Sequence, residues 1–260
     1  MALRPSQPAA LSIAGSDSSG GAGLQADLRT MTKLGVHGAS VVTCVTAQNP
    51  GAVSAIHPTP AKVIAAQLDS VFSSLPIRAV KTGMLYSRSI TDVVAECLAK
   101  RKRLQLVIDP VMISSSGTPL LKPSAALALA KRLLPLARLV TPNLDEAAAL
   151  GARPVREPEE MRDAARAIHE RFGCAVLVKG GHMKTTEAID LFYDGHEEFL
   201  LSALRVQGVS PPGTGCTYSA AITAFLARGE RLPKAVELAK QHMAEAFSGV
   251  FRVGKHRFLG

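Results

Sequence analysis

The chain has 260 residues, 47% of them hydrophobic and 4% aromatic, with no Trp, and it carries a net charge of +9. This length and composition predict one large α/β domain with a core of Ala, Leu and Val, and the charge favours an anionic partner. Nucleic acid is disfavoured, because the densest basic run, residues 100–103, has no interleaved aromatic side chains and is typical of a solvated helix end.

Short β-branched runs alternate with segments of helical periodicity through most of the chain. Six strands, each with a helical partner, are predicted at residues 10–14, 40–46, 78–81, 104–108, 138–140 and 174–178. Continuous apolar runs are typical of strands buried on both faces, and strand–helix alternation predicts right-handed crossovers between parallel strands. We therefore expect a mostly parallel central sheet flanked by helices on both faces.

The pattern changes in the C-terminal half of the chain. Residues 188–193 and 198–201 flank the dipeptide Asp194-Gly195, which predicts a small β-hairpin. Two helices follow, at about residues 215–226 and 234–250. Because no linker, repeat or shift in composition divides the sequence, residues 1–260 are predicted to form a single domain.

The cysteines and the first residues bear on the compartment. The four cysteines lie far apart, at positions 44, 97, 174 and 216, so we expect neither a zinc site nor a disulfide framework. Prolines stand at positions 5 and 8, where a signal peptide needs an apolar run, and no apolar stretch is long enough to span a bilayer. The expectation is a soluble cytoplasmic protein with no membrane partner.

Each predicted parallel strand ends in glycine or in polar residues. The six clusters are residues 15–17, 47–49, 81–84, 109–110, 141–143 and 179–182. Any one of them could be an ordinary turn, but in open α/β sheets ligands bind outside the carboxyl ends of the strands. Six clusters at the same edge therefore indicate the rim of an enzyme's active site.

The first glycine-rich segment gives only a weak signal for a nucleotide cofactor. Residues 21–26 fit the dinucleotide-binding pattern G-x-G-x-x-A, but the second strand ends in Gln48-Asn49, where such a site needs an acidic residue for the ribose. A nucleotide-binding oxidoreductase is therefore disfavoured. The P-loop motif is absent from the sequence.

The second glycine-rich segment is more specific. Gly213, Thr214, Gly215 and Cys216 open a predicted helix, so successive backbone N–H groups and the positive end of the helix can meet at one anion. Such a nest can stabilise a phosphoryl group during transfer. The alternative is a glycine-rich helix start beside a buried cysteine.

Acidic and basic residues at three strand ends complete a candidate phosphate site. Asp109 and Glu146, with Asn143, could hold Mg²⁺ directly or through water, and Lys179 could lie beside phosphates. The alternatives are a turn at Asp109-Pro110, a helix N-terminus at residues 143–146, and a solvated lysine.

Several blocks together resemble the hydroxymethylpyrimidine/phosphomethylpyrimidine kinases of thiamine biosynthesis. In chain order they are residues 14–17 (AGSD), 19–23 (SGGAG), 25–27 (QAD), 45–49 (VTAQN), 80–85 (VKTGML), 109–112 (DPVM), 141–144 (TPNL), 178–182 (VKGGH) and 213–217 (GTGCT). The resemblance implies a ribokinase-like fold, ATP with Mg²⁺, a homodimer, and two successive phosphorylations of 4-amino-5-hydroxymethyl-2-methylpyrimidine.

The resemblance also implies a role for each matched residue. The aminopyrimidine pocket would be formed by Gly15, Asp27, Gln48 and Met84. The amide of Gln48 can donate and accept along one edge of the ring, and Met84 is a soft surface for its face. The metal would bind Asp109 and Glu146. The nucleotide side would comprise Asn143, Lys179 and Lys240, and the anion hole Gly213 to Cys216, with Cys216 at the position of the catalytic base.

Two departures from the family pattern concern the acceptor side. Pro212 stands where a histidine is common, and residues 113–117 lack a lysine that often precedes Ser-Gly. Residues 114–117 are a candidate mobile flap. Cys216 itself raises a question, because related sugar kinases place Asp there. A helix N-terminus should lower the pKa of the thiol, while a neutral thiol would not repel a second acceptor that is already a phosphate. Alternatively, Cys216 mainly positions the acceptor.

Two rival functions remain beside this one. A pyridoxal or pyridoxine kinase of the same superfamily also acts on a ring hydroxymethyl group. A catalytically silent pyrimidine-binding regulator is the other, although it would have no need of Asp109, Glu146, Lys179 and the 213–216 nest.

Overall fold

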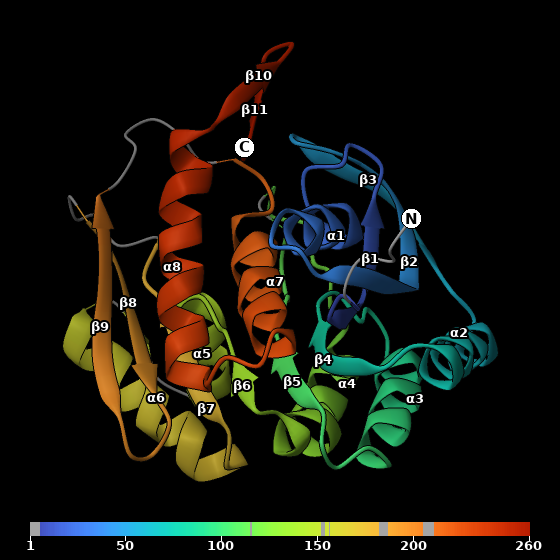
Figure 1. The fold of residues 1–260 in the computed structure, drawn as a ribbon, viewed down its shortest axis with the longest axis horizontal. Helices are drawn as coiled ribbons and strands as arrows, with labels where there is room; N and C mark the ends of the chain where they lie inside the picture. Colours follow the sequence, from blue (N-terminus) through green and yellow to red (C-terminus); the bar gives the residue numbers. More distant parts are fainter. Residues whose placement is uncertain (1–5, 115, 152–153, 156, 182–186, 205–210) are drawn as a thin grey trace.

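A nine-stranded sheet forms the centre of the computed structural model, which describes residues 6–114, 116–151, 154–155, 157–181, 187–204 and 211–260 (Figure 1). Its strand order is β3-β2-β1-β4-β5-β6-β7-β8-β9. The strands are β1 (Ala9–Asp17), β2 (His37–Asn49), β3 (Ala52–Pro58), β4 (Ile77–Thr82), β5 (Gln105–Ile108), β6 (Leu139–Val140), β7 (Ala175–Lys179), β8 (Glu187–Tyr193) and β9 (Glu198–Leu204). The six strands from β2 to β7 in this order are parallel. The antiparallel strands are β3 at one edge, and β8 followed by the edge strand β9 at the other.

Helices cover both faces of the sheet, as predicted (Figure 1). They are α1 (Gly23–Lys33), α2 (Ala61–Ser74), α3 (Arg88–Ala99), α4 (Pro123–Ala128) with a π turn and a 3₁₀ turn up to Leu136, α5 (Leu144–Gly151), α6 (Pro158–Phe172), α7 (Thr214–Ala227) and α8 (Leu232–Ser248). Within β5, Leu106 and Ile108 join the core under α2 to α6, while Val107 joins the core under α1, α7 and α8. Alternating side chains of one apolar strand thus feed two cores.

The predicted hairpin is confirmed as β8 and β9, with Gly195 at a φ of +92° in the turn. Two antiparallel elements were not predicted. The strand β3 pairs with β2 after a turn at Pro50-Gly51, and the last helix ends at Ser248, before a hairpin of β10 (Phe251–Val253) and β11 (His256–Phe258). Both are short edges whose residues are largely exposed, so they lack the apolar run that marks a buried strand.

The order of the strands reverses beside β1. Its neighbours are β2 on one side and β4 on the other, both parallel to it. Such a switch point opens a crevice at the carboxyl ends of the strands, because the following connections leave in opposite directions. The fold therefore brings the clusters at Gly15 and Met84 to the place where α/β proteins bind ligands.

Candidate active site

Two glycine-rich loops meet above the switch point, the first at residues 18–23 and the second at residues 211–216. Gly213 has a φ of +77°, and a Cβ there would lie 2.0 Å from the carbonyl oxygen of Gly21. Gly23 has a φ of +55°, and a Cβ there would lie 2.3 Å from the carbonyl oxygen of Gly15. These glycines are required because the backbones touch. The N-termini of α1 and α7 are thereby placed side by side (Figure 1).

The expected phosphate lysine forms an ion pair at the start of α7. Lys179 Nζ lies 2.9 Å from Asp109 Oδ1, and Ser219 and Thr141 also donate to this carboxylate, at 3.2 and 3.3 Å. A Cβ on Gly215 would lie 3.1 Å from Lys179 Nζ. The ammonium, the carboxylate and the nest therefore form one cluster, as the sequence predicted. Burial would raise the pKa of Asp109, but the charges of Lys179 and Lys81 and the hydrogen bonds from Lys179 and Ser219 together hold it below its usual range.

Asn143 and Glu146 form a reciprocal cap on α5. Asn143 Oδ1 accepts from the N–H of Glu146, and Glu146 Oε2 accepts from the N–H of Asn143, both at 2.9 Å. Residues 143–146 therefore also form the helix N-terminus that was the alternative to a metal site. Burial and the charge of nearby Asp109 nevertheless raise the pKa of Glu146 to about 7, although Lys179 opposes them. Two carboxyl groups that repel each other are a donor set that fits Mg²⁺, because a divalent cation would offset the repulsion.

The residues expected to hold the pyrimidine come together at the switch point in part. A Cβ on Gly15 would lie 3.0 Å from the sulfur of Met84, so the ends of β1 and β4 are in contact here. Gln48, at the end of β2, bonds through its main chain to the Ser18 hydroxyl at 2.8 Å, and its Oε1 accepts from Thr46 at 3.2 Å. These contacts place Gln48 beside the first glycine loop.

Asp27 lies deeper than the expected pocket residues. Its carboxylate is fully buried, accepts two 2.8 Å bonds from Lys81 Nζ and accepts one 2.6 Å bond from the Ser12 hydroxyl. Burial would lower the pKa of Lys81, but the charge and hydrogen bonds of Asp27, with smaller contributions from Cys216 and Asp109, together hold that pKa above its usual range. Burial also raises the pKa of Asp27, although Lys81 opposes it, and the 2.8 Å geometry identifies a buried ion pair beneath the acceptor side of the site.

The pKa expected for Cys216 is wrong. The helix N-terminus was expected to lower it, whereas burial raises the pKa of the thiol to about 11, although Lys81 lowers it. Burial remains the largest influence although Cys216 keeps part of its surface exposed, because its sulfur lies against the first glycine loop, where the N–H of Gly23 faces it. Cys216 is therefore a neutral thiol at neutral pH. This agrees with the idea that the thiol does not repel an acceptor that is already a phosphate.

Lys240 is not brought to this cluster. Its Nζ lies 2.7 Å from Asp190 Oδ2 and donates to the carbonyl oxygen of Ala188 at 2.8 Å. A contact with the nucleotide therefore stays a prediction. No role was predicted for Lys81, which was placed only in a strand-end cluster, or for Ser219 and Asp190. A charged residue inside an otherwise apolar strand is the signal that could have found Lys81 and Asp190, because burial of a charge needs a partner.

The two departures from the family pattern have plain structural settings. Pro212 packs on Gly21, where a Cβ would lie 2.8 Å from the proline ring, so the second loop rests on the first through an apolar contact. The candidate flap closes as a turn, with Ser114 N–H donating to Thr118 O at 2.8 Å and Gly117 at a φ of +86°. Ser115 of this segment and His182 of the lysine motif lie outside the described residues.

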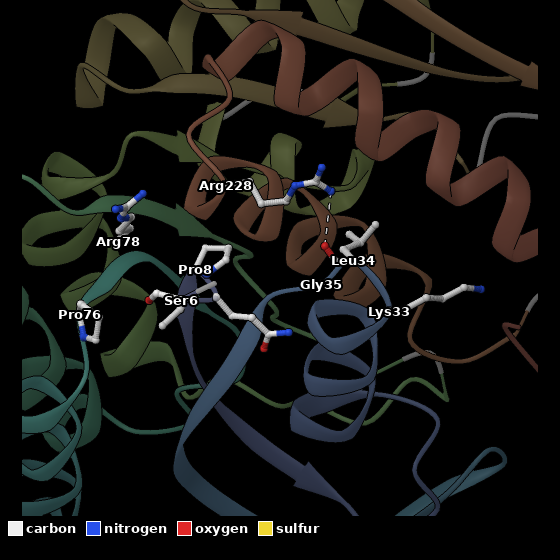
Figure 2. A pocket seen from close by; sticks show the side chains of 10 residues that line it. Ser6, Pro8, Lys33, Leu34, Gly35, Pro76, Arg78 and Arg228 are labelled. Atoms are coloured by element: carbon white, nitrogen blue, oxygen red, sulfur yellow. Dashed lines mark hydrogen bonds between the residues drawn. The ribbon is translucent and has the colours of Figure 1, made fainter. Parts of the chain in front are cut away.

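A separate cavity lies at the opposite, amino edge of the sheet (Figure 2). It has a volume of about 700 Å³, and Lys33, Arg78 and Arg228 line it. Arg228 Nη1 donates to the carbonyl oxygen of Leu34 at 3.4 Å, the bond drawn in Figure 2. Lys33 and Arg228 sit at the C-terminal ends of α1 and α7, where cations are favourable. This cavity is remote from the predicted site.

The family model for phosphomethylpyrimidine kinase matches residues 17–259. The chain belongs to this family. A hydroxymethylpyrimidine/phosphomethylpyrimidine kinase from Rhizobium meliloti is 50% identical to it over 245 residues, covering 94% of this chain and 92% of the relative. The predicted family and phosphotransferase activity are thus confirmed.

Two solved structures agree with the predicted ribokinase-like fold. A phosphomethylpyrimidine kinase from Clostridium difficile aligns with a TM-score of 0.83 at 41% identity, covering 93% of this chain and all of that one. Pyridoxal kinase from Bacillus subtilis, in complex with ADP, aligns with a TM-score of 0.90 at 35% identity, covering 98% and 97%. No helix in the described ranges is both long and apolar enough to cross a membrane.

Proposed function

We propose that this kinase phosphorylates 4-amino-5-hydroxymethyl-2-methylpyrimidine and then its monophosphate, with ATP as the donor. The observation that carries the proposal is the cluster of Lys179, Asp109 and Gly215 beside the neutral thiol of Cys216. It joins a phosphate-binding charge to an acceptor position with no fixed negative charge. The name of the Rhizobium meliloti relative supports both steps, and the ADP complex of the Bacillus subtilis enzyme supports the adenine nucleotide.

The acceptor ring would lie at the switch point between β1 and β4. Gly15 leaves the space, Met84 covers the ring face, and Gln48 offers its amide to the ring edge. Asp27 would act from beneath, since Lys81 and Ser12 already occupy its oxygens. Its contribution is then the orientation of the pocket and a fixed local field.

The donor phosphates would lie across the N-terminus of α7. Lys179 can turn from Asp109 to the transferring phosphate, and the N–H groups from Gly213 to Cys216 receive the developing charge. Asn143 stands at the neighbouring strand end for the nucleotide side. Asp109 and Glu146 would hold Mg²⁺, which would neutralise phosphate charge.

Cys216 would serve both acceptors because it is neutral. Phosphoryl transfer is largely dissociative, so the acceptor hydroxyl keeps its proton until late, and positioning matters more than base strength. In the second step the acceptor is itself a phosphate, and a neutral thiol does not repel it as a carboxylate would. If Cys216→Asp kept the second phosphorylation while Cys216→Ala abolished it, this explanation would be wrong.

Product analysis by mass spectrometry tests the function directly. Purified protein with Mg²⁺ and ATP receives the hydroxymethylpyrimidine, its monophosphate and pyridoxal in separate reactions. We expect the diphosphate from the monophosphate. A single phosphorylation of pyridoxal alone would instead favour the second candidate, a pyridoxal kinase, which the 35% identity to the Bacillus subtilis enzyme keeps in view. The homodimer and the cytoplasmic location stay predictions.

A further inference from the structure

A buried ion pair on the far side of α7 joins the last helix to the strand pair beside Lys179. Lys240 comes from α8 and Asp190 from β8, and both side chains are at most 10% exposed. Their atoms Nζ and Oδ2 lie 2.7 Å apart, and Nζ also donates to Ala188 O. Taking two such charges out of water is costly, so they need a geometric reason to be there.

The second oxygen of Asp190 holds the main chain next to Lys179. The N–H of Gly180 donates to Asp190 Oδ1 at 3.0 Å, and residues 179 and 190 stand opposite each other in the antiparallel pair of β7 and β8. On its other side Lys179 is held by one bond from its own N–H to the carbonyl oxygen of Pro142 at 2.8 Å. Asp190 thus holds the backbone at the end of β7, directly after Lys179.

Two glycines follow Lys179, so side-chain packing cannot hold this stretch of backbone in place. Asp190 is also next to α7. The hydroxyl of Tyr218, two residues after Cys216, is buried, and burial together with the charge of Asp190 raises its pKa well above the usual range. One carboxylate therefore bonds to the lysine turn and to α8, and its charge acts on a buried hydroxyl of the helix that carries the nest.

We propose that Asp190 and Lys240 are positioning residues for Lys179. The carboxylate anchors the Gly180 N–H, and Lys240 holds that carboxylate in place, so that the Lys179 ammonium stays within reach of the nest. Lys240 then acts on the nucleotide only through Asp190 and Lys179. The inference rests on the proposed role of Lys179 at the donor phosphates.

The test separates the charge of Asp190 from its hydrogen bond. Lys240→Met alone leaves an unpaired buried carboxylate and could fail to fold, so two double variants carry the experiment. Lys240→Met/Asp190→Asn is neutral and keeps an oxygen for the Gly180 N–H, whereas Lys240→Met/Asp190→Leu is neutral and has none. Lys234→Met is the control, because Lys234 is on the same helix and pairs only with exposed Glu237.

Two measurements are made on each variant, the dissociation constant of ADP by calorimetry and kcat/KM for ATP. We expect the leucine variant to bind ADP and turn over ATP at least tenfold more weakly than the asparagine variant, with equal melting temperatures. In a Lys179→Ala background the same exchange should change neither quantity more than twofold. Equal values for the two double variants, or a full tenfold loss in the Lys179→Ala background, would overturn the inference.

The same data distinguish a failure of the proposed function. If Lys179→Ala itself left ADP binding and turnover intact, the proposed role of Lys179 at the phosphates would be wrong. Its positioning by Asp190 could then have no effect on the nucleotide. If Lys179→Ala impaired both while the leucine and asparagine variants behaved alike, only the positioning inference would fail.

Discussion

Two Lys–Asp pairs lie near the reaction site, and they differ in their access to solvent. Both side chains of the Asp27–Lys81 pair are 0% exposed, whereas Lys179 is 13% exposed and Asp109 is 3% exposed. In the first pair the lysine donates hydrogen bonds to both oxygens of one carboxylate, which also accepts a bond from the Ser12 hydroxyl. In the second pair the lysine makes a single 2.9 Å bond to the carboxylate and borders the glycines of the nest.

This difference separates a fixed charge from an exchangeable one. In a sealed pair, which is buried away from water, neither ion can leave the other to bind a ligand, because each would then lack both a partner and solvation. A pair at the mouth of an anion hole can exchange partners, because phosphate offers the ammonium a second partner and a cation offers the carboxylate one. We therefore expect Asp27–Lys81 to govern stability and Asp109–Lys179 to govern turnover.

The largest expected effect is on stability and concerns the sealed pair. Lys81→Met removes the cation that partners Asp27 in the core, where burial already raises the pKa of this carboxyl, and should lower the free energy of unfolding by about 3–5 kcal/mol. Adding Asp27→Asn should restore most of this loss, because no buried charge remains. Urea denaturation followed by circular dichroism measures both variants. A Lys81→Met protein within about 1 kcal/mol of the wild type would show that the pair is not sealed.

The second prediction concerns the open pair and turnover. Lys179→Met should lower kcat about 10²- to 10³-fold, since it removes a charge that acts on the transferring phosphate. Its effect on stability should be smaller than that of Lys81→Met, because Ser219 and Thr141 still donate to Asp109. Steady-state kinetics and urea denaturation of the same preparation give both numbers. A larger loss of stability than of activity would reverse the comparison.

The smallest expected effect of removing a charged pair is on the rate of alkylation of the Cys216 thiol. With a pKa of about 11, its alkylation by iodoacetamide should be slow at pH 7 and quicken about tenfold per pH unit up to pH 10. The double variant Lys81→Met/Asp27→Asn should slow this reaction at pH 9 a few fold, because Lys81 lowers the pKa of the thiol more than Asp27 raises it.

Lys179→Met should slow the alkylation only slightly, since Lys179 and the thiol interact but Lys81 lowers the pKa of the thiol more strongly. Cys216→Ser corrects for reaction at the other cysteines, whose pKa values are also raised by burial. A plateau of the rate near pH 8 would mean that the helix N-terminus dominates after all.

Local pattern predicted much of the fold and part of the site. The apolar runs and the polar strand ends were enough to predict the parallel sheet, the β8–β9 hairpin and the meeting of Asp109 and Lys179, because parallel strands end at one edge. Gly215 was joined to them only through the family resemblance. The exposed edge strand β3 and the terminal hairpin were missed, since short exposed strands carry no burial pattern.

Partners of charged groups could not be predicted in the same way. Asp27 and Lys81 are 54 residues apart, and Lys240 and Asp190 are 50 apart. Nothing in the local sequence says which carboxylate a buried lysine will meet. The same holds for the Cys216 thiol, whose position at a helix start suggested a low pKa while the surrounding atoms raise it.

The sequence by itself therefore determined the family, the order of strands and helices, and the residue types at the rim, because these follow from periodicity, glycine placement and matched blocks. Only the tertiary structure decided which charges are sealed and which are open, that Lys240 turns to Asp190, and that Cys216 stays neutral. The physical reason is that solvation and electrostatic pairing depend on every atom packed around a group, and those atoms come from distant parts of the chain.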